Sequence, residues 1–256
     1  MASVTQRIKQ IKQPRGGYLN PKDFTTINLD DGIELNCNEN INSILVGLAV
    51  DYMTRYMNGS SEKDAFKISI LGAKKVGESD YAAKLLEGLI ALDDKAISNA
   101  CKLVGYDTCF RAGIGTYKPV QEISPDADTI SNIRVMINRS LNFIDEYGPI
   151  VKDGFTFFGG YTRTVTTGDG DFLTEDTLWD FKVSKKEPTS SHTLQLLMYY
   201  LLGIHSIHPE FDSIKNLGIF NPRLNKVYLL EISKIPKEII EQVSSEVIGY
   251  WNIYKR

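Results

Sequence analysis

The fold is decided by one stretch in the second half of the chain, Gly168-Asp169-Gly170-Asp171-Phe172-Leu173-Thr174-Glu175-Asp176-Thr177-Leu178-Trp179-Asp180-Phe181-Lys182-Val183. Two segments rich in apolar, aromatic and β-branched side chains, 171–174 and 177–183, flank the polar pair Glu175-Asp176, which is typical of a hairpin. Side chains alternate between the two faces of a strand, so Leu178, Asp180 and Lys182 share one face. We therefore expect a hairpin that presents a carboxylate beside an amine.

Two acids and a lysine converge if this hairpin forms. Asp171 lies at the start of the first strand, and Asp180 and Lys182 lie on the second. Two converging carboxylates suit a hard divalent cation such as Mg²⁺, which prefers oxygen ligands. A lysine beside the cation can orient or activate a water for attack on phosphorus, while the metal neutralises charge on the phosphoryl oxygens. The pattern predicts a metal-dependent phosphodiesterase site.

A simpler interpretation treats the same residues as structural. The opposite face of the second strand is apolar and would be buried, which leaves Asp180 and Lys182 as a surface ion pair on a half-exposed strand. Asp169 and Asp171 would then be turn residues. An isolated Asp-x-Lys favours this interpretation, so the choice depends on the surrounding sequence.

The rest of the chain predicts an α/β fold. In the first half, an extended region at 25–36 with a hairpin turn at Asp31-Gly32 precedes helices at 41–57, 62–74, 79–92, 94–104 and 129–146. The second half predicts strands at 155–158 and 161–167, the hairpin, a helix at 191–202, strands at 217–220 and 227–232, and a closing helix at 237–254. We expect a single domain, 1–256, in which a mainly helical part, 1–150, packs on a β-rich catalytic core, 151–256, whose mixed β-sheet is flanked by helices.

The amino-acid composition limits which binding partners and which cellular compartment we expect for this protein. The formal charge of -3 indicates no overall basic character, so a nucleic acid would have to bind through a local patch or a metal. The 3 cysteines include no Cys-x-x-Cys pair, which argues against a disulfide framework or a zinc site of four cysteines. The polar, basic start of the chain differs from a signal peptide, and no apolar stretch is long enough to cross a membrane. We expect a cytoplasmic protein.

Three motifs follow one another in the second half. Gly168 and Asp171 form Gly-x-x-Asp, Asp180 and Lys182 form Asp-x-Lys, and the next helix carries Gln-x-x-x-Tyr, residues 195–199. In this order the motifs resemble the RecB-type, exonuclease-like branch of the PD-(D/E)XK nucleases, over about residues 161–203. The resemblance implies a PD-(D/E)XK nuclease-like sheet and a Mg²⁺- or Mn²⁺-dependent nuclease.

The resemblance also implies a role for each motif residue. Asp171 and Asp180 would bind the metal, with the main-chain carbonyl of Phe181 as a further ligand. Lys182 would serve the attacking water. Asp169 is a rival to Asp171, but the glycine spacing favours Asp171.

Further residues are candidates for binding substrate. Gln195 and Tyr199 are four apart and share a helix face, so together they can hold a phosphate or stack on a base. His192 precedes Gln195 by almost one turn, and it either touches substrate or is simply half-buried. Lys185 and Lys186 follow the Asp-x-Lys strand, where they either contact phosphates or belong to a solvated loop.

One expected group departs from the resemblance. RecB-type enzymes commonly contribute a histidine from an upstream helix in a Gly-x-x-x-His setting. Here Gly47 is followed at that spacing by Asp51, whose carboxylate can also bind magnesium. Asp51 is therefore a candidate metal ligand, a solvated helix acid is the alternative, and Glu87 on the 79–92 helix is the fallback.

The function expected from these residues is hydrolysis of nucleic-acid phosphodiester bonds, with DNA as the favoured substrate and an exonuclease-like action in phage or bacterial DNA metabolism or defence. The alternative is a catalytically inactive nuclease-fold module that binds nucleic acid or a protein. A metal-dependent hydrolase of another phosphate ester is a third possibility, because the same chemistry serves different leaving groups.

Overall fold

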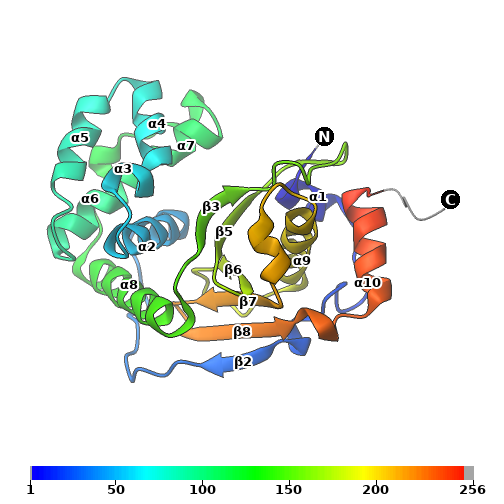
Figure 1. Cartoon of the computed structure of the whole chain (residues 1–256). Helices are drawn as coiled ribbons and strands as arrows, with labels where there is room; N and C mark the ends of the chain where they lie inside the picture. Colours follow the sequence, from blue (N-terminus) through cyan, green and yellow to red (C-terminus); the bar gives the residue numbers. More distant parts are fainter. Residues whose placement is uncertain (1, 251–256) are drawn as a thin grey trace. The chain divides into compact units, whose positions relative to one another are not determined.

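The computed structural model describes residues 2–250 (Figure 1). The chain divides into two compact units, one formed by Met1–Leu29 with Ile144–Arg256 and the other by Asp30–Phe143. The candidate nuclease motifs all lie in the first unit, where the N-terminal residues join the second half of the chain. The expectation of a single domain with its parts divided near residue 150 stays a prediction.

The first unit is built on a mixed sheet of six strands in the order β2-β8-β7-β6-β5-β3. β6 and β7 run parallel, and every other neighbouring pair in this sheet is antiparallel. The strands are β2 (Thr25–Asn28), β3 (Lys152–Thr156), β5 (Asp169–Leu173), β6 (Thr177–Phe181), β7 (Asn216–Asn221) and β8 (Lys226–Glu231). β1 (Ala2–Ser3) and β4 (Val165–Thr167) form a separate parallel pair. The predicted α/β class, a mixed sheet with flanking helices, is confirmed.

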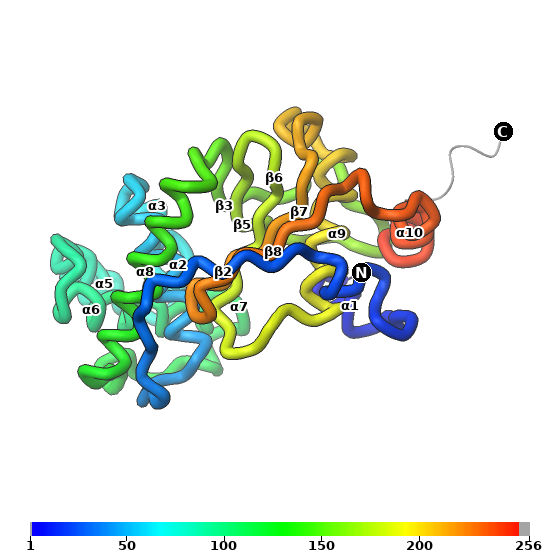
Figure 2. Tube along the Cα trace, turned by 90° about the horizontal axis from the view of Figure 1, so that it is seen from below, coloured from blue at the N-terminus to red at the C-terminus, as the bar shows by residue number. Residues whose placement is uncertain are grey.

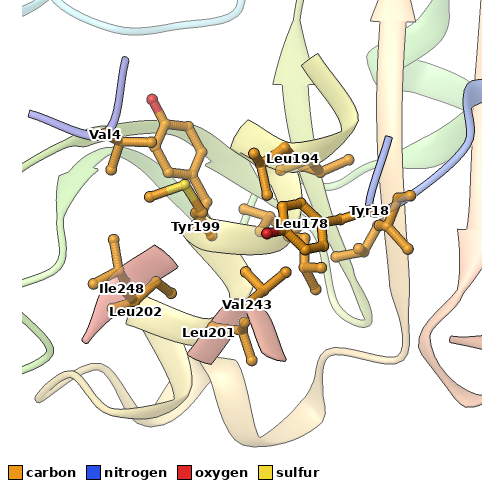
Figure 3. Packing of buried hydrophobic residues seen from close by; sticks show 14 of the residues in the cluster. Val4, Tyr18, Leu178, Leu194, Tyr199, Leu201, Leu202, Val243 and Ile248 are labelled. Carbon is orange, nitrogen blue, oxygen red and sulfur yellow. The ribbon is translucent and has the colours of Figure 1, made fainter. Parts of the chain in front are cut away.

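The helix α9 (Ser190–Ile204) covers one face of this sheet, where it contacts β6 and β7 (Figure 1). It is apolar on most sides, as expected of a helix enclosed by other elements. Leu194, Leu201 and Leu202 belong to one buried core with Val4 from α1 (Val4–Gln10) and Ile248 from the C-terminal segment, and Figure 3 shows Leu202 beside Ile248. Each such leucine contributes about 1.5–3 kcal/mol through burial, so this core holds α9 firmly on the sheet.

The C-terminal segment lies beside α1, as Figures 1 and 2 both show. It consists of α10 (Lys237–Gln242) and a π-helical turn, Val243–Ile248, and it ends at Gly249 with a φ of 89°. Arg7 joins the two elements by donating from Nε to the carbonyl of Val247 at 2.9 Å. The predicted closing helix therefore changes geometry at Val243, and its positions 251–254 lie outside the described residues.

The opposite face of β6 is also buried. The Trp179 indole is 1% exposed and packs between the rings of Phe172 and Tyr147. Gly218 on β7 gives the indole room, because a Cβ there would lie 2.3 Å from the ring. β6 is thus covered on both faces, and the half-exposed strand assumed in the alternative structural interpretation is not observed.

The second unit is helical. Its helices are α2 (Ser43–Met57), α3 (Glu62–Ala65), α4 (Lys67–Val76), α5 (Ser79–Glu87), α6 (Asp94–Val104), α7 (Asp107–Arg111) and most of α8 (Ala127–Tyr147). A buried carboxylate, Asp107, accepts hydrogen bonds from Tyr52 and Ser69, both at 2.6 Å. The guanidinium of Arg139 is paired with Asp31 at 2.7 Å. These satisfied polar groups lie among the helices around an apolar core that includes the fully buried rings of Phe66 and Tyr106.

The boundaries differ from the predictions where neighbouring elements intervene. The predicted 62–74 helix breaks at Phe66, whose buried ring packs edge-on against Tyr52. Asp31-Gly32 makes no hairpin, because β2 pairs with the distant β8 and Asp31 pairs with Arg139. Only Val165–Thr167 of the predicted 161–167 strand is extended in a ladder, with β1 as its partner.

Candidate functional site

Asp180 lies near the C-terminal end of β6 and is 1% exposed. Alternation along the strand places it with Leu178 on the face that α9 covers. The ammonium of Lys182 lies 2.9 Å from each carboxylate oxygen, and it donates a hydrogen bond to Oδ1. Oδ2 is buried and makes no hydrogen bond to the described residues, although the same ammonium lies 2.9 Å away as an ion-pair partner. Both carboxylate oxygens of Asp180 therefore lie against the Lys182 ammonium.

Asp171 shares this face. In the antiparallel β5–β6 pair Phe172 is opposite Trp179, and one more step along the register brings Asp171 opposite Asp180. Directly opposed side chains project from the same face of a sheet. The carboxylate Oδ2 of Asp171 accepts the backbone N–H of Phe181 at 2.7 Å. The hairpin thus brings the two predicted metal-binding acids together, as the sequence indicated.

Tyr199 and Gln195 approach the carboxylates from α9. The amide Nε2 of Gln195 donates to the Tyr199 hydroxyl at 2.7 Å, and the Tyr199 ring lies 5.0 Å from that of Phe157. Burial raises the pKa of the Tyr199 phenol above its ordinary value of 10.0, and the charges of Asp180 and Asp171 raise it further. The phenol stays neutral and can donate its proton in a hydrogen bond. Tyr199 is 4% exposed, so it is more enclosed than a projecting substrate contact would be.

His192 belongs to the same cluster. Burial lowers the pKa of its imidazole below 6.5, Lys182 lowers it further, and Asp180 opposes the shift. Its Nδ1 accepts the backbone N–H of Thr189 at 3.2 Å, which caps the start of α9. An imidazole that accepts at Nδ1 carries its proton on Nε2. His192 therefore has both a structural role at the helix end and an electrostatic link to the Asp-x-Lys pair.

Close packing explains the glycine of the Gly-x-x-Asp motif, Gly168. A Cβ at Gly168 would lie 2.8 Å from Val4 of α1, which leaves no room for a side chain. The carbonyl of Gly168 accepts the Tyr161 hydroxyl at 2.7 Å, and the same hydroxyl accepts the backbone N–H of Phe157 at 3.0 Å. These contacts hold the turn that leads to Asp171.

The loop between β6 and α9 is held at its two sides. Asn221 donates to the carbonyl of Ser184 at 2.9 Å, and Glu187 accepts from Lys226 at 2.6 Å and from Tyr228. The hydrogen bond from Lys226 is the main cause that lowers the pKa of the Glu187 carboxyl. The loop therefore leaves Lys182 in a defined position.

The remaining candidate metal ligands lie in the other unit or already take part in other interactions. Asp51 on α2 pairs with Arg55 at 3.0 Å, and Glu87 is exposed at the end of α5. Both belong to the Asp30–Phe143 unit, so their roles as metal ligands stay predictions. The metal-binding role of the Phe181 carbonyl is likewise a prediction, although its N–H already contacts Asp171.

Comparison with known proteins adds no relative. No family model, curated protein or solved structure matches this chain. Within residues 2–250, no helix has both the length and the apolar character needed to cross a membrane. In the same part of the chain, no group of 3 or more His, Cys, Asp or Glu side chains is arranged to hold a metal ion. A metal at Asp171 and Asp180 would have to complete its coordination with main-chain carbonyls, water or substrate.

Proposed function

We propose that this protein is a metal-dependent nuclease, with DNA as the favoured substrate and an exonuclease-like action. The observation that carries the proposal is the buried carboxylate of Asp180, which faces the α9 side of the sheet and contacts the Lys182 ammonium. Asp171, on the neighbouring strand, supplies the second carboxylate. The three motif segments lie on consecutive elements, β5, β6 and α9, as the resemblance to RecB-type PD-(D/E)XK nucleases implies.

The donor set fits magnesium or manganese better than zinc. Magnesium is commonly held by one or two carboxylates, and it retains waters and binds substrate phosphates at its other positions. Asp171 and Asp180 would hold the ion, with the Phe181 carbonyl as a further ligand. When bound, the ion would polarise the phosphoryl oxygens and neutralise their growing charge.

The protein's own groups have separable tasks in this proposal. Lys182 holds the attacking water by hydrogen bonding and compensates the charge of Asp180. The half-buried Gln195 would bind a substrate oxygen, and the enclosed Tyr199 hydroxyl would orient its amide. The enclosed position of Tyr199 excludes water from the side of the site that α9 covers, which strengthens each of these electrostatic interactions.

Cleavage of end-labelled single- and double-stranded DNA and RNA with Mg²⁺ or Mn²⁺ tests the proposal. We expect metal-dependent cutting by the parent protein and a loss of about 10²-fold or more in Lys182→Ala, typical of removing a group that stabilises a transition state. Lys215→Ala is the control, because Lys215 is exposed before β7. Parental activity in Lys182→Ala, or no cutting by a folded parent protein, would contradict the proposal.

A second candidate is a nuclease-fold binding module without catalysis. It is favoured because, within residues 2–250, no group of 3 or more His, Cys, Asp or Glu side chains is arranged to hold a metal ion. In such a module the Lys182 ammonium would substitute permanently for the metal. Unaltered nucleic-acid binding by Asp180→Ala, with no cleavage by the parent protein, distinguishes it from the nuclease.

A further inference from the structure

The N-terminal segment carries a strong local positive charge in a chain whose formal net charge is -3. Its cations are Arg7, Lys9, Lys12, Arg15 and Lys22, and the first acidic residue of the chain is Asp23. A concentrated cationic segment in an acidic protein attracts a polyanion locally, although the protein as a whole does not.

This segment is attached to the elements that form the candidate site. Near its start, Val4 packs against Gly168, three residues before Asp171 on the chain. Near its end, the carbonyl of Leu19 accepts the hydroxyl of Thr193 on α9 at 2.6 Å, two residues before Gln195. The cations between these two contacts therefore belong to a segment that is anchored beside α9.

The side chains of this segment divide into buried and exposed sets. Val4 and Ile8 are buried in the core shared with α9, whereas Lys9, Lys12 and Arg15 are exposed. Arg7 is bound to main-chain carbonyls of the C-terminal segment, including that of Glu246 at 2.8 Å. Three cations thus face solvent on a firmly anchored support.

A second pair of exposed cations precedes α9 on the chain. Lys185 and Lys186 lie on the loop between β6 and α9, which continues directly from Lys182. Gly17 approaches the first residue of α9 so closely that a Cβ there would lie 2.5 Å from Ser190. The N-terminal segment and the loop that carries Lys185 and Lys186 therefore both reach the beginning of α9, where His192 also lies.

We propose that Lys9, Lys12, Arg15, Lys185 and Lys186 form a cationic platform that binds the phosphate backbone of a nucleic-acid strand leading to Asp171 and Asp180. The inference rests on the proposed function, which supplies the reason for a polyanion at this place. It also gives a function to the N-terminal segment, which lies outside the nuclease motifs.

A phosphate backbone fits this surface better than a membrane. Helices that bind membrane surfaces insert an exposed apolar face between the lipids. In α1 the apolar residues Val4 and Ile8 are already buried against the core, so its exposed side offers charge and glutamines such as Gln10. Basic and amide side chains are common contacts to nucleic-acid phosphates.

The test is the affinity of labelled single- and double-stranded oligonucleotides, measured by fluorescence anisotropy in EDTA over a series of salt concentrations. The parent protein is compared with a triple variant, Lys9→Gln, Lys12→Gln and Arg15→Gln. A control variant loses the same charge at exposed positions of the other unit through Lys74→Gln, Lys84→Gln and Lys95→Gln. The single variant Arg15→Gln lies after α1 and tests the platform without changing a helix.

We expect the triple variant to bind at least about tenfold more weakly and to reduce the slope of log affinity against log salt by about 2–3, since each phosphate contact contributes about 0.7–0.9. Arg15→Gln should reduce the slope by about one contact, and the control should match the parent protein. Parental affinity and slope in the triple variant, or an equal loss in the control, would overturn the platform. Tighter binding of the parent protein to phosphatidylserine vesicles than to DNA would overturn it in favour of a membrane.

Cleavage assays separate this inference from the proposed function. If the parent protein binds DNA through these cations but never cuts it, the platform stands and the nuclease fails. If both the parent protein and the triple variant cut with the same KM, the nuclease stands and the platform fails. If the nuclease and the platform are both correct, the triple variant should have a raised KM and a nearly unchanged kcat. The reason is that the platform binds substrate away from the reacting phosphate.

Discussion

The ion pair between Asp180 and Lys182 can be broken by substituting one partner or removed by substituting both. The relative stabilities of these variants test whether the buried carboxylate serves a ligand or the fold. Lys182→Met leaves a carboxylate that is 1% exposed without its cation. The double variant Asp180→Leu, Lys182→Met removes both charges and fills the site with apolar atoms. Lys215→Met serves as an exposed control.

The expected magnitudes follow from burial. Breaking a buried ion pair by removing one partner costs about 3–5 kcal/mol, because the other charge stays desolvated. The Lys182 side chain is 24% exposed and water can partly replace it, so we expect a loss near the lower end, about 3 kcal/mol. Apolar replacement of a whole buried pair is often neutral or stabilising by about 1–4 kcal/mol, and we expect the double variant to be at least as stable as the parent protein.

Urea unfolding, followed by tryptophan fluorescence and circular dichroism, gives the free energies of unfolding. The same titrations with Mn²⁺ give the metal linkage, which amounts to about 2.7 kcal/mol at a hundredfold excess over Kd. We expect Mn²⁺ to stabilise the parent protein and to have no effect on the double variant. The exposed control should change by less than about 0.5 kcal/mol.

Two results would refute this reasoning. Parental stability in Lys182→Met would mean that the carboxylate is not desolvated as the structure indicates. A double variant less stable than Lys182→Met would mean that Asp180 serves the fold itself, so that no ligand is needed to explain a buried acid at this position.

Three further predictions test other parts of the structure. Gly218→Ala places a Cβ 2.3 Å from the neighbouring indole ring and should cost about 1–3 kcal/mol in urea unfolding, whereas Gly115→Ala, with no atom within 4 Å, should be nearly neutral. Arg139→Met removes a 6% exposed guanidinium from Asp31 and should lower the free energy of unfolding by about 3 kcal/mol, with a corresponding fall in Tm. The pKa of His192 is lowered in the folded protein, so as pH falls below 6.5 the unfolded chain takes up a proton at His192 before the folded protein does. The parent protein should therefore lose stability in this range, and His192→Gln should lose less. Equal urea midpoints for both proteins across this range would contradict the assignment.

Much of the candidate site could be predicted because its parts are local. The hairpin through Glu175-Asp176 and the helix that carries Gln195 and Tyr199 both follow from short-range periodicity and turn residues, and both are present. Four-residue spacing also predicted that Gln195 and Tyr199 meet, which their hydrogen bond confirms.

The burial of the site could not be predicted in the same way. Alternation along β6 predicted one apolar and one polar face, but both faces are covered, one by α9 and the other by the rings around Trp179. The contribution of α1 was also missed, because Val4 and Gly168 are separated by most of the chain. The sequence indicated a role for this segment only through its cations before Asp23, and their position beside α9 is known only from the folded structure.

The sequence by itself determined the order of the elements and the chemical groups that three of them carry. The tertiary structure alone decided which strands are neighbours, that β2 closes the sheet against β8, and that Asp180 is desolvated. The physical reason is one of range. Backbone conformation and side-chain alternation depend on adjacent residues, whereas the desolvation of a carboxylate depends on every atom packed around it, and those atoms come from distant parts of the chain.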